Sequence, residues 1–186
     1  MKRASIVLAM LATTLAGSAP LAQAQESSAS QAQANEQKGP TLGGHIGFVL
    51  SLVTHSGGQT TSLGDAPAVG FPTGITVKGS GSMAFDFEFV PQYNATGTRQ
   101  TTLTLHPGLI YGMGHGWAVG LRAAFVVDQP TVGFTPLVNH SWPIKRKNSL
   151  FKAYFVEADL PVRFSRPVGA PPTNAVTFAV HTGVAF

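Results

Sequence analysis

Some titratable side chains of this sequence lie two positions apart in short stretches, and this spacing limits the chemistry open to them. Two carboxylate pairs, 86/88 and 157/159, are each separated by one residue. Successive side chains of a β-strand point to opposite faces, so each pair projects from one face of its strand. Such a set can form ion pairs, line a polar conduit or supply an acid and a base. The candidates are Asp86, Glu88, His106, Arg122, Glu157, Asp159, Arg163 and His181.

Nucleophilic catalysis has one weak candidate. His55, Ser56 and Asp65 fall in a single predicted loop, and these residue types could supply a base and a nucleophile. Their composition fixes no geometry, and all three are ordinary loop residues. We therefore assign no catalytic residue and expect a protein that is not an enzyme.

Metal and nucleic-acid chemistry are disfavoured. The six histidines show no ligand spacing, so we expect neither a metal site nor a cofactor. The net charge of +4 includes Lys2 and Arg3 of a predicted leader. The remaining ten basic and eight acidic residues leave only +2, which argues against a nucleic-acid partner.

These residues would be positioned by eight segments of alternating polarity between Gly43 and Phe186. In each segment Phe, Leu, Ile and Val occupy one parity, and Gly, Ala, Thr, Ser and the candidate charges occupy the other. The segments centre on residues 46–52, 69–77, 83–89, 102–111, 117–127, 132–139, 154–164 and 175–186. Prolines at 72, 91, 107, 136 and 161 interrupt them, and each implies a bulge, a strand end or a local gap.

The connections predict a meander of neighbouring strands. Residues 79–81 and 112–116 are glycine-rich hairpin turns, and residues 143–148 carry the basic triplet 145–147. The last is interpreted as a solvated turn near lipid head groups. The connections at 54–68, 94–100, 128–130 and 165–174 would lie at the opposite end. Only the first of these four is long.

The composition of the polar face decides between a soluble and a membrane barrel. An exterior that faces water should be rich in Lys and Glu. Here the polar face is mostly Gly, Ala, Thr and Ser, which suits the crowded interior of a small barrel. The apolar face would then meet lipid, with Tyr111, Trp117, Trp142 and Phe186 near one rim and Tyr93 near the other.

The last segment carries the most specific pattern. Its outward parity holds Phe178, Val180, Val184 and the terminal Phe186. This resembles the C-terminal assembly signal of bacterial outer-membrane barrels, and residues 43–186 resemble in pattern the small eight-stranded barrels of the OmpA and OmpX type. The resemblance implies an all-β, eight-stranded antiparallel up-and-down transmembrane barrel in the outer membrane. Its partners would be outer-membrane lipid, lipopolysaccharide and the barrel-assembly machinery.

The N-terminal region predicts export. A cationic start, an apolar run over residues 4–16 and Ala22-Gln23-Ala24 are typical of a cleaved signal peptide spanning residues 1–24. Residues 25–42 lack large apolar side chains except Leu42, and we expect a disordered periplasmic tail before a barrel at 43–186. The absence of cysteine means that no disulfide stabilises the domain.

Three functions stay open on this basis. An eight-stranded barrel has little room inside, so paired charges favour a plugged lumen and a structural or surface-interaction role. A conduit for small or apolar solutes is the second reading, with a lateral opening near Pro91 and Pro107 as its sign. The third is a lipid-modifying enzyme, but lipid A deacylases place His and Ser two apart, whereas His140 and Ser141 are adjacent.

Overall fold

The computed structural model of the protein describes residues 39–97 and 101–186. The predicted signal peptide and nearly all of the predicted tail lie outside these residues. No helix in the described part is long and apolar enough to cross a membrane. The strands are β1 (Thr41–Ser56), β2 (Gln59–Ser62), β3 (Ala68–Gly70), β4 (Thr73–Lys78), β5 (Met83–Asn94), β6 (Thr101–Gly114), β7 (Trp117–Val126), β8 (Thr131–Pro143), β9 (Ala153–Asp159), β10 (Val162–Ser165) and β11 (Thr173–Ala185).

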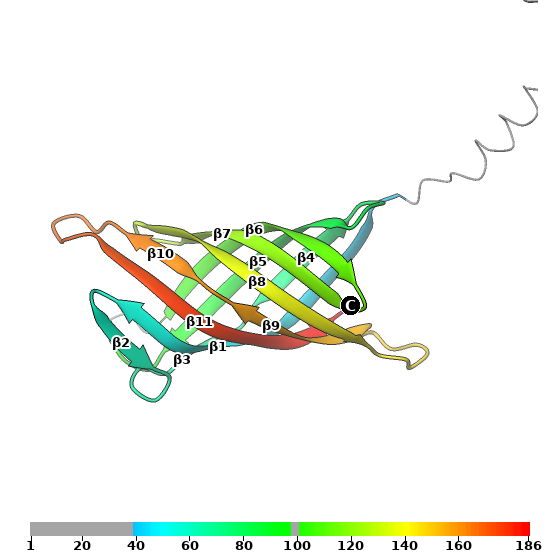
Figure 1. Ribbon diagram of the computed structural model, residues 1–186, viewed down its shortest axis with the longest axis horizontal. Coiled ribbons are helices and arrows are strands. Elements are labelled where there is room, and N and C mark those ends of the chain that lie inside the picture. The colour runs from blue at the N-terminus through cyan, green and yellow to red at the C-terminus, as the bar shows by residue number, and fades with distance from the viewer. Residues whose placement is uncertain (1–38, 98–100) are drawn as a thin grey trace, which may run out of the picture. The chain divides into compact units, whose positions relative to one another are not determined.

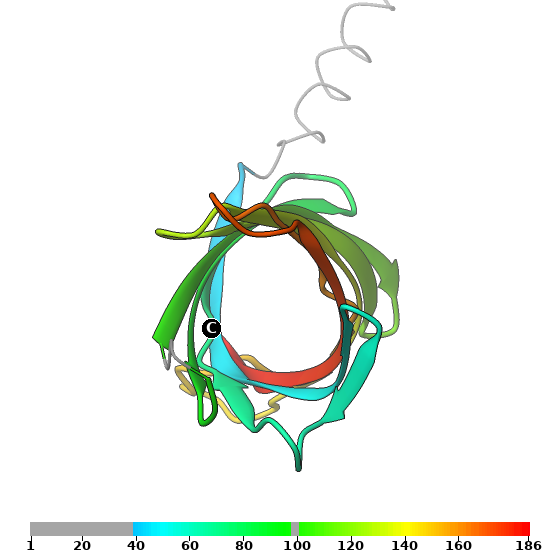
Figure 2. The ribbon, with the colours of Figure 1, turned by 90° about the vertical axis from the view of Figure 1, so that its left-hand side faces the viewer.

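The strands close into a single antiparallel ring, because β11 pairs with β1 from Ala185 back to Ala175. Two positions in the ring are each occupied by two short strands in succession, β3 with β4 and β9 with β10. Each such pair counts as one stave, by which we mean one of the eight strand positions of the barrel. Figures 1 and 2 show the ring from the side and from one end. The predicted eight-stranded antiparallel barrel is therefore confirmed.

The stagger of the ring can be followed through its residue pairs. One circuit of paired residues begins on β1 and returns to β1 ten residues further along the strand. With eight staves, a stagger of this size tilts the strands by about 40° and leaves an interior just wide enough for side chains. The circuit runs through Thr41, Lys78, Ala84, Ile110, Gly120, Leu137, Asp159, Ala179 and Ser51.

The prolines coincide with gaps in the ladder, as proline removes a backbone donor. Pro91 lies opposite the break between β3 and β4, where the Phe71 amide still donates to the Pro91 carbonyl at 2.8 Å. Pro136 lies opposite the break between β9 and β10, where the Leu160 amide donates to its carbonyl at 3.0 Å. The pairing of β6 with β7 skips Pro107. The register continues unchanged across each of these gaps.

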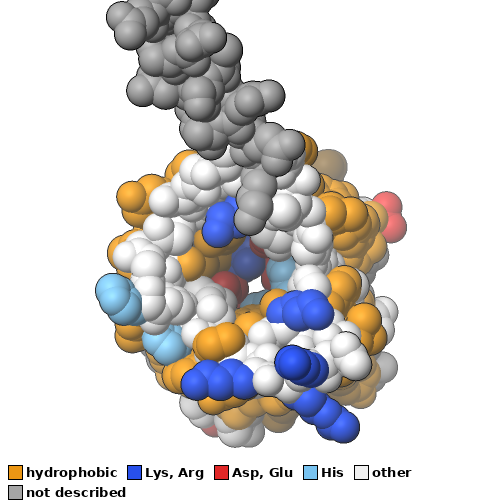
Figure 3. Space-filling view, turned by 90° about the vertical axis from the view of Figure 1, so that its right-hand side faces the viewer, with side chains coloured by type: hydrophobic (Ala, Val, Ile, Leu, Met, Phe, Trp, Pro, Cys, Tyr) orange, Lys and Arg blue, Asp and Glu red, His pale blue; other side chains and the backbone are white. Residues whose placement is uncertain are grey.

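The outer wall is apolar around the barrel. Large hydrophobic side chains are exposed on every stave, from Phe48 on β1 to Phe178 on β11. The buried side chains inside the barrel are mostly polar or charged. Figure 3 shows hydrophobic side chains around the outside and charged ones within the hollow. This inversion of the usual arrangement is what a wall in contact with hydrocarbon requires.

The two ends of the barrel differ. At the turn end lie the C-terminus and the connections 79–82, 115–116 and 144–152; at the loop end lie the connections 57–67 and 166–172 (Figure 1). One expectation was wrong: residues 54–68 are not a plain loop, because β1 continues to Ser56 and β2 folds back on it. The barrel also begins at Thr41, two residues before the expected boundary.

Candidate functional site: the charged lumen

Arg122 holds the middle of the lumen together. It lies on β7, is only 4% exposed, and faces carboxylates from both sides. Its Nε donates to Asp86 Oδ2 at 2.9 Å, and its Nη1 donates to Glu157 Oε1 at 2.6 Å. Its Nη2 lies 3.6 Å from Glu88 Oε1. The guanidinium thus bridges three acids, two from β5 and one from β9.

Histidines complete this cluster. His45 Nε2 lies 2.8 Å from Glu88 Oε1, and His106 Nδ1 lies 3.3 Å from Glu88 Oε2. His181 Nδ1 lies 3.2 Å from Glu157 Oε1. We call the seven residues the mid-lumen cluster; they come from six of the eight staves and all are buried. Its members are His45, Asp86, Glu88, His106, Arg122, Glu157 and His181.

Sequence reasoning missed two parts of this arrangement. His45 was not among the candidate residues that the sequence indicated. Phe155 is an aromatic on the inner parity, 5% exposed, and its ring packs edge-on against His181 at 4.9 Å and His45 at 5.8 Å. The signal was available, since Phe155 shares its parity with Glu157 and Asp159.

Two inward glycines make room for the cluster. A Cβ at Gly108 would lie 2.6 Å from Arg122 Cγ, and Gly108 is the residue paired with Arg122 in the ladder. A Cβ at Gly74 would collide with the imidazole of His45. Side chains at these two positions would therefore push Arg122 and His45 away from their acids.

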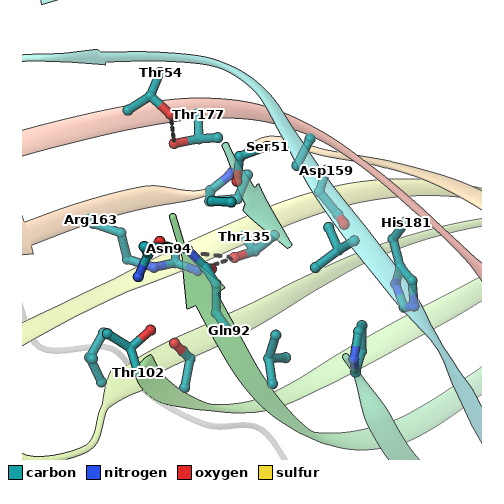
Figure 4. A pocket seen from close by; sticks show the side chains of 18 of the residues that line it. Ser51, Thr54, Gln92, Asn94, Thr102, Thr135, Asp159, Arg163, Thr177 and His181 are labelled. Atoms are coloured by element: carbon teal, nitrogen blue, oxygen red, sulfur yellow. Dashed lines mark hydrogen bonds between the residues drawn. The ribbon is translucent and has the colours of Figure 1, made fainter. Parts of the chain in front are cut away.

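On the loop-end side of the cluster the lumen widens into a cavity of about 370 Å³, which we call the outer cavity. Arg163, the other predicted lumen arginine, lines it (Figure 4). Its Nη1 donates to Thr135 Oγ1 at 3.2 Å and to two backbone carbonyls, and its Nη2 contacts His106 Nε2 at 2.9 Å. Unlike Arg122, it has no carboxylate within 4.0 Å among the described residues.

Asp159 lines the same cavity and is 6% exposed. Its Oδ1 is buried and has no hydrogen-bond partner in the described part of the chain. Neither Asp159 nor Arg163 therefore joins the ion pairs of the mid-lumen cluster, although both lie in the lumen as the sequence indicated.

The cluster contains two sets of groups of the kind that hold metal ions. One is His45, Asp86 and Glu88, the other Glu88, Glu157 and His181, and within each set the ligand atoms lie within 4.8 Å of one another. The histidines are thus less scattered than their sequence spacing indicated. Arg122 already provides the cation that these carboxylates contact.

The loop candidates for catalysis do not converge. His55 Nδ1 lies 2.9 Å from Thr60 Oγ1 across the β1–β2 hairpin, and Asp65 accepts hydrogen bonds from the amide and hydroxyl of Ser62. Within the described residues, no hydrogen bond joins His55, Ser56 and Asp65. His140 lies between Trp117 and Trp142, with ring centroids 4.5 Å and 4.2 Å away.

At the turn end, Phe186 closes the ring. Its amide donates to the Gly44 carbonyl at 2.9 Å, and the Gly44 amide donates back to the Phe186 carbonyl at 3.1 Å. A Cβ at Gly44 would lie 2.8 Å from the Phe186 ring, so the aromatic side chain covers this glycine on the outer face. Trp142 and Tyr154 stack nearby at the same end, with centroids 5.0 Å apart.

Comparisons with known proteins find likeness only at the level of structure. No family model matches the chain, and neither does any curated protein sequence. One similar solved structure is the outer membrane protein OprG from Pseudomonas aeruginosa, with 12% identity, a TM-score of 0.41 and coverage of 81% of this chain and 97% of that one. Another is Ail, the attachment invasion locus protein of Yersinia pestis, with 10% identity, a TM-score of 0.41 and coverage of 80% of this chain and 99% of that one. The fold assigned above rests on the strand pairing of this chain itself.

Proposed function

We propose that this chain is a bacterial outer-membrane β-barrel whose lumen is plugged at mid-depth and which has a structural or surface-interaction role. The observation that carries the proposal is the combination of an apolar outer wall on every stave with a cluster of paired charges inside. A soluble barrel would reverse this arrangement.

The membrane placement is supported by the aromatic residues at the turn end and by the closed ring of strands. Tyr111, Trp117, Trp142 and Tyr154 gather at the turn end and are 38–49% exposed, as aromatic girdles at a lipid–water boundary are. The ring has no free edge, because β11 pairs with β1, and a strand within hydrocarbon must satisfy all its backbone groups.

The plug is supported by the contacts of Arg122. Six staves contribute to the mid-lumen cluster, and Arg122 joins acids from β5 and β9 across the interior. Solute conduction is the second candidate, favoured by the outer cavity of about 370 Å³. A lipid-modifying activity would need His55, Ser56 and Asp65 to meet, and their contacts lead elsewhere.

Detergent dependence tests the membrane proposal. The full chain should stay monodisperse only with detergent, and the folded form should migrate differently on a gel before and after heating. In cells it should fractionate with the outer membrane. A monodisperse protein in buffer without detergent would overturn the proposal.

A further inference from the structure

Arg163 is the starting point, because its contacts differ in kind from those of Arg122. Four groups accept its Nη hydrogens: Thr135 Oγ1, the carbonyls of Phe134 and Val162, and His106 Nε2. A guanidinium can only donate, so His106 Nε2 must act as the acceptor and carry no proton. The Nδ1 of His106 is then left to donate to Glu88. Every contact partner of Arg163 is therefore uncharged.

The charge of Arg163 is thus left without a counter-ion in contact. A buried charge is costly unless it is paired, and no carboxylate among the described residues lies within 4.0 Å of this guanidinium. Arg163 is only half-buried, however, and lines the outer cavity. The counter-ion can consequently come from solution through this cavity.

The outer cavity has the size and lining of a small-molecule site. Its volume of about 370 Å³ corresponds to roughly a dozen water molecules. Its wall is rich in hydroxyl and amide groups that can bond a polar ligand, among them Ser51, Thr54, Gln92, Thr102 and Thr104. Figure 4 labels Ser51, Thr54, Gln92 and Thr102 among the side chains that line the cavity together with Arg163. The mid-lumen cluster lies at the inner end of the cavity, since Glu88, Arg122 and His181 also line it.

We propose that the outer cavity binds a small molecule that carries a carboxylate, with Arg163 as its counter-ion. Two sources share this chemistry: a simple carboxylate and an amino acid. Asp159 distinguishes them, because it lines the same cavity and its carboxyl group could accept a hydrogen bond from a ligand ammonium. This inference concerns binding and does not depend on whether the lumen conducts.

Calorimetric titration of the full chain in an uncharged detergent tests the proposal. Propionate should bind saturably at low ionic strength and more weakly as salt screens the charge. Propionamide has the same shape without the charge and should not bind measurably. Equal binding of propionate and propionamide, or no saturable binding of propionate and alanine, would overturn the proposal. Because this comparison uses the unaltered chain, it stands even if a variant fails to fold.

Two substitutions locate the site. Arg163→Gln should weaken propionate binding by roughly tenfold or more, as expected for the loss of a hydrogen bond to a charged group. Arg166→Gln removes a nearby exposed arginine that does not line the cavity and should leave binding unchanged. Heat-modifiable migration shows whether the Arg163→Gln variant folds. If the folded variant binds propionate with wild-type affinity, the assignment is wrong.

The amino-acid source is tested with alanine, which is propionate with an added ammonium group. Tighter binding of alanine than of propionate, lost in Asp159→Asn, would identify an amino acid as the ligand. Equal or weaker binding of alanine would identify a simple carboxylate. Either result supports a carboxylate site at Arg163. Failure of the binding experiments would not bear on whether the lumen conducts, which is measured separately.

Discussion

Arg122 Nη1 and Glu157 Oε1 lie 2.6 Å apart inside the barrel, although β8 separates their strands in the sheet. The side chains must therefore reach each other through the lumen. The same guanidinium contacts Asp86 on the other side, so one residue ties together two opposite parts of the wall. The proposed plug of the lumen therefore depends on Arg122 more than on any other residue of the mid-lumen cluster.

Replacing Arg122 should destabilise the barrel strongly. Arg122→Ala leaves Asp86, Glu88 and Glu157 buried without their cation, and breaking a buried pair costs about 3–5 kcal/mol in the free energy of unfolding. Urea unfolding in detergent, followed by the heat-modifiable band, measures the change. Arg166→Ala, at an exposed arginine, is the control and should change stability by less than about 0.5 kcal/mol. An equal effect of both substitutions would show that the ion pairs contribute nothing specific.

The room left by Gly74 should matter as well. Gly74→Ala places a methyl group against the His45 imidazole and should separate it from Glu88, at a cost of about 1–3 kcal/mol. Gly81→Ala is the matched control, since nothing lies within 4 Å of a Cβ at that turn position. The same unfolding assay compares the two variants. Unchanged stability of Gly74→Ala would mean that His45 can move away without loss.

The terminal aromatic should affect assembly. Phe186→Lys replaces the ring that covers Gly44 with a charge on the outer face, whereas Ala185 belongs to the inward parity. We expect the outer-membrane level of Phe186→Lys to fall well below that of Ala185→Lys. The comparison uses quantitative blotting of membrane fractions after matched expression. Equal levels of the two variants would argue against a role of the C-terminal aromatic as an assembly signal.

The loop after β2 should respond to pH through Asp65. Hydrogen bonds from the hydroxyl and then the amide of Ser62 lower the pKa of this carboxyl group from its usual value. Because the pKa is lowered, these hydrogen bonds stabilise the loop at neutral pH, and this stabilisation is lost as the pH falls through the lowered pKa. Amide exchange at Ser62 should therefore accelerate, relative to its intrinsic rate, in strongly acidic solution. Asp65→Asn should show little of this pH dependence; an identical profile would exclude the Asp65 contact as its cause.

The alternation of polar and apolar residues was enough to predict the barrel and the face on which the charges lie. It was not enough to predict their partners. Which residues meet across the lumen depends on a stagger of ten residues accumulated over all eight staves, and each register is set by pairings that no single segment encodes. For this reason the three acid partners of Arg122 could not be assigned from the sequence, and the participation of His45 was missed.

Arg163 shows the same limit from another side. Parity placed it in the lumen with Asp159, and the sequence analysis grouped both residues with the candidate charges. The interruption at Pro161 instead leaves β10 as a separate short strand, and the guanidinium reaches Thr135 and His106. Composition alone carries no signal for that choice of neutral partners.

Conductance in planar lipid bilayers tests the central claim, that the mid-lumen cluster closes the barrel. The wild-type chain, inserted in folded form, should give no steady current above that of the lipid alone. Arg122→Ala should raise the current if it remains folded, because removing the guanidinium opens a path for water between acids that no longer share a cation. Steady, reproducible channel openings of the wild-type protein would contradict a plugged lumen and make solute conduction the better account.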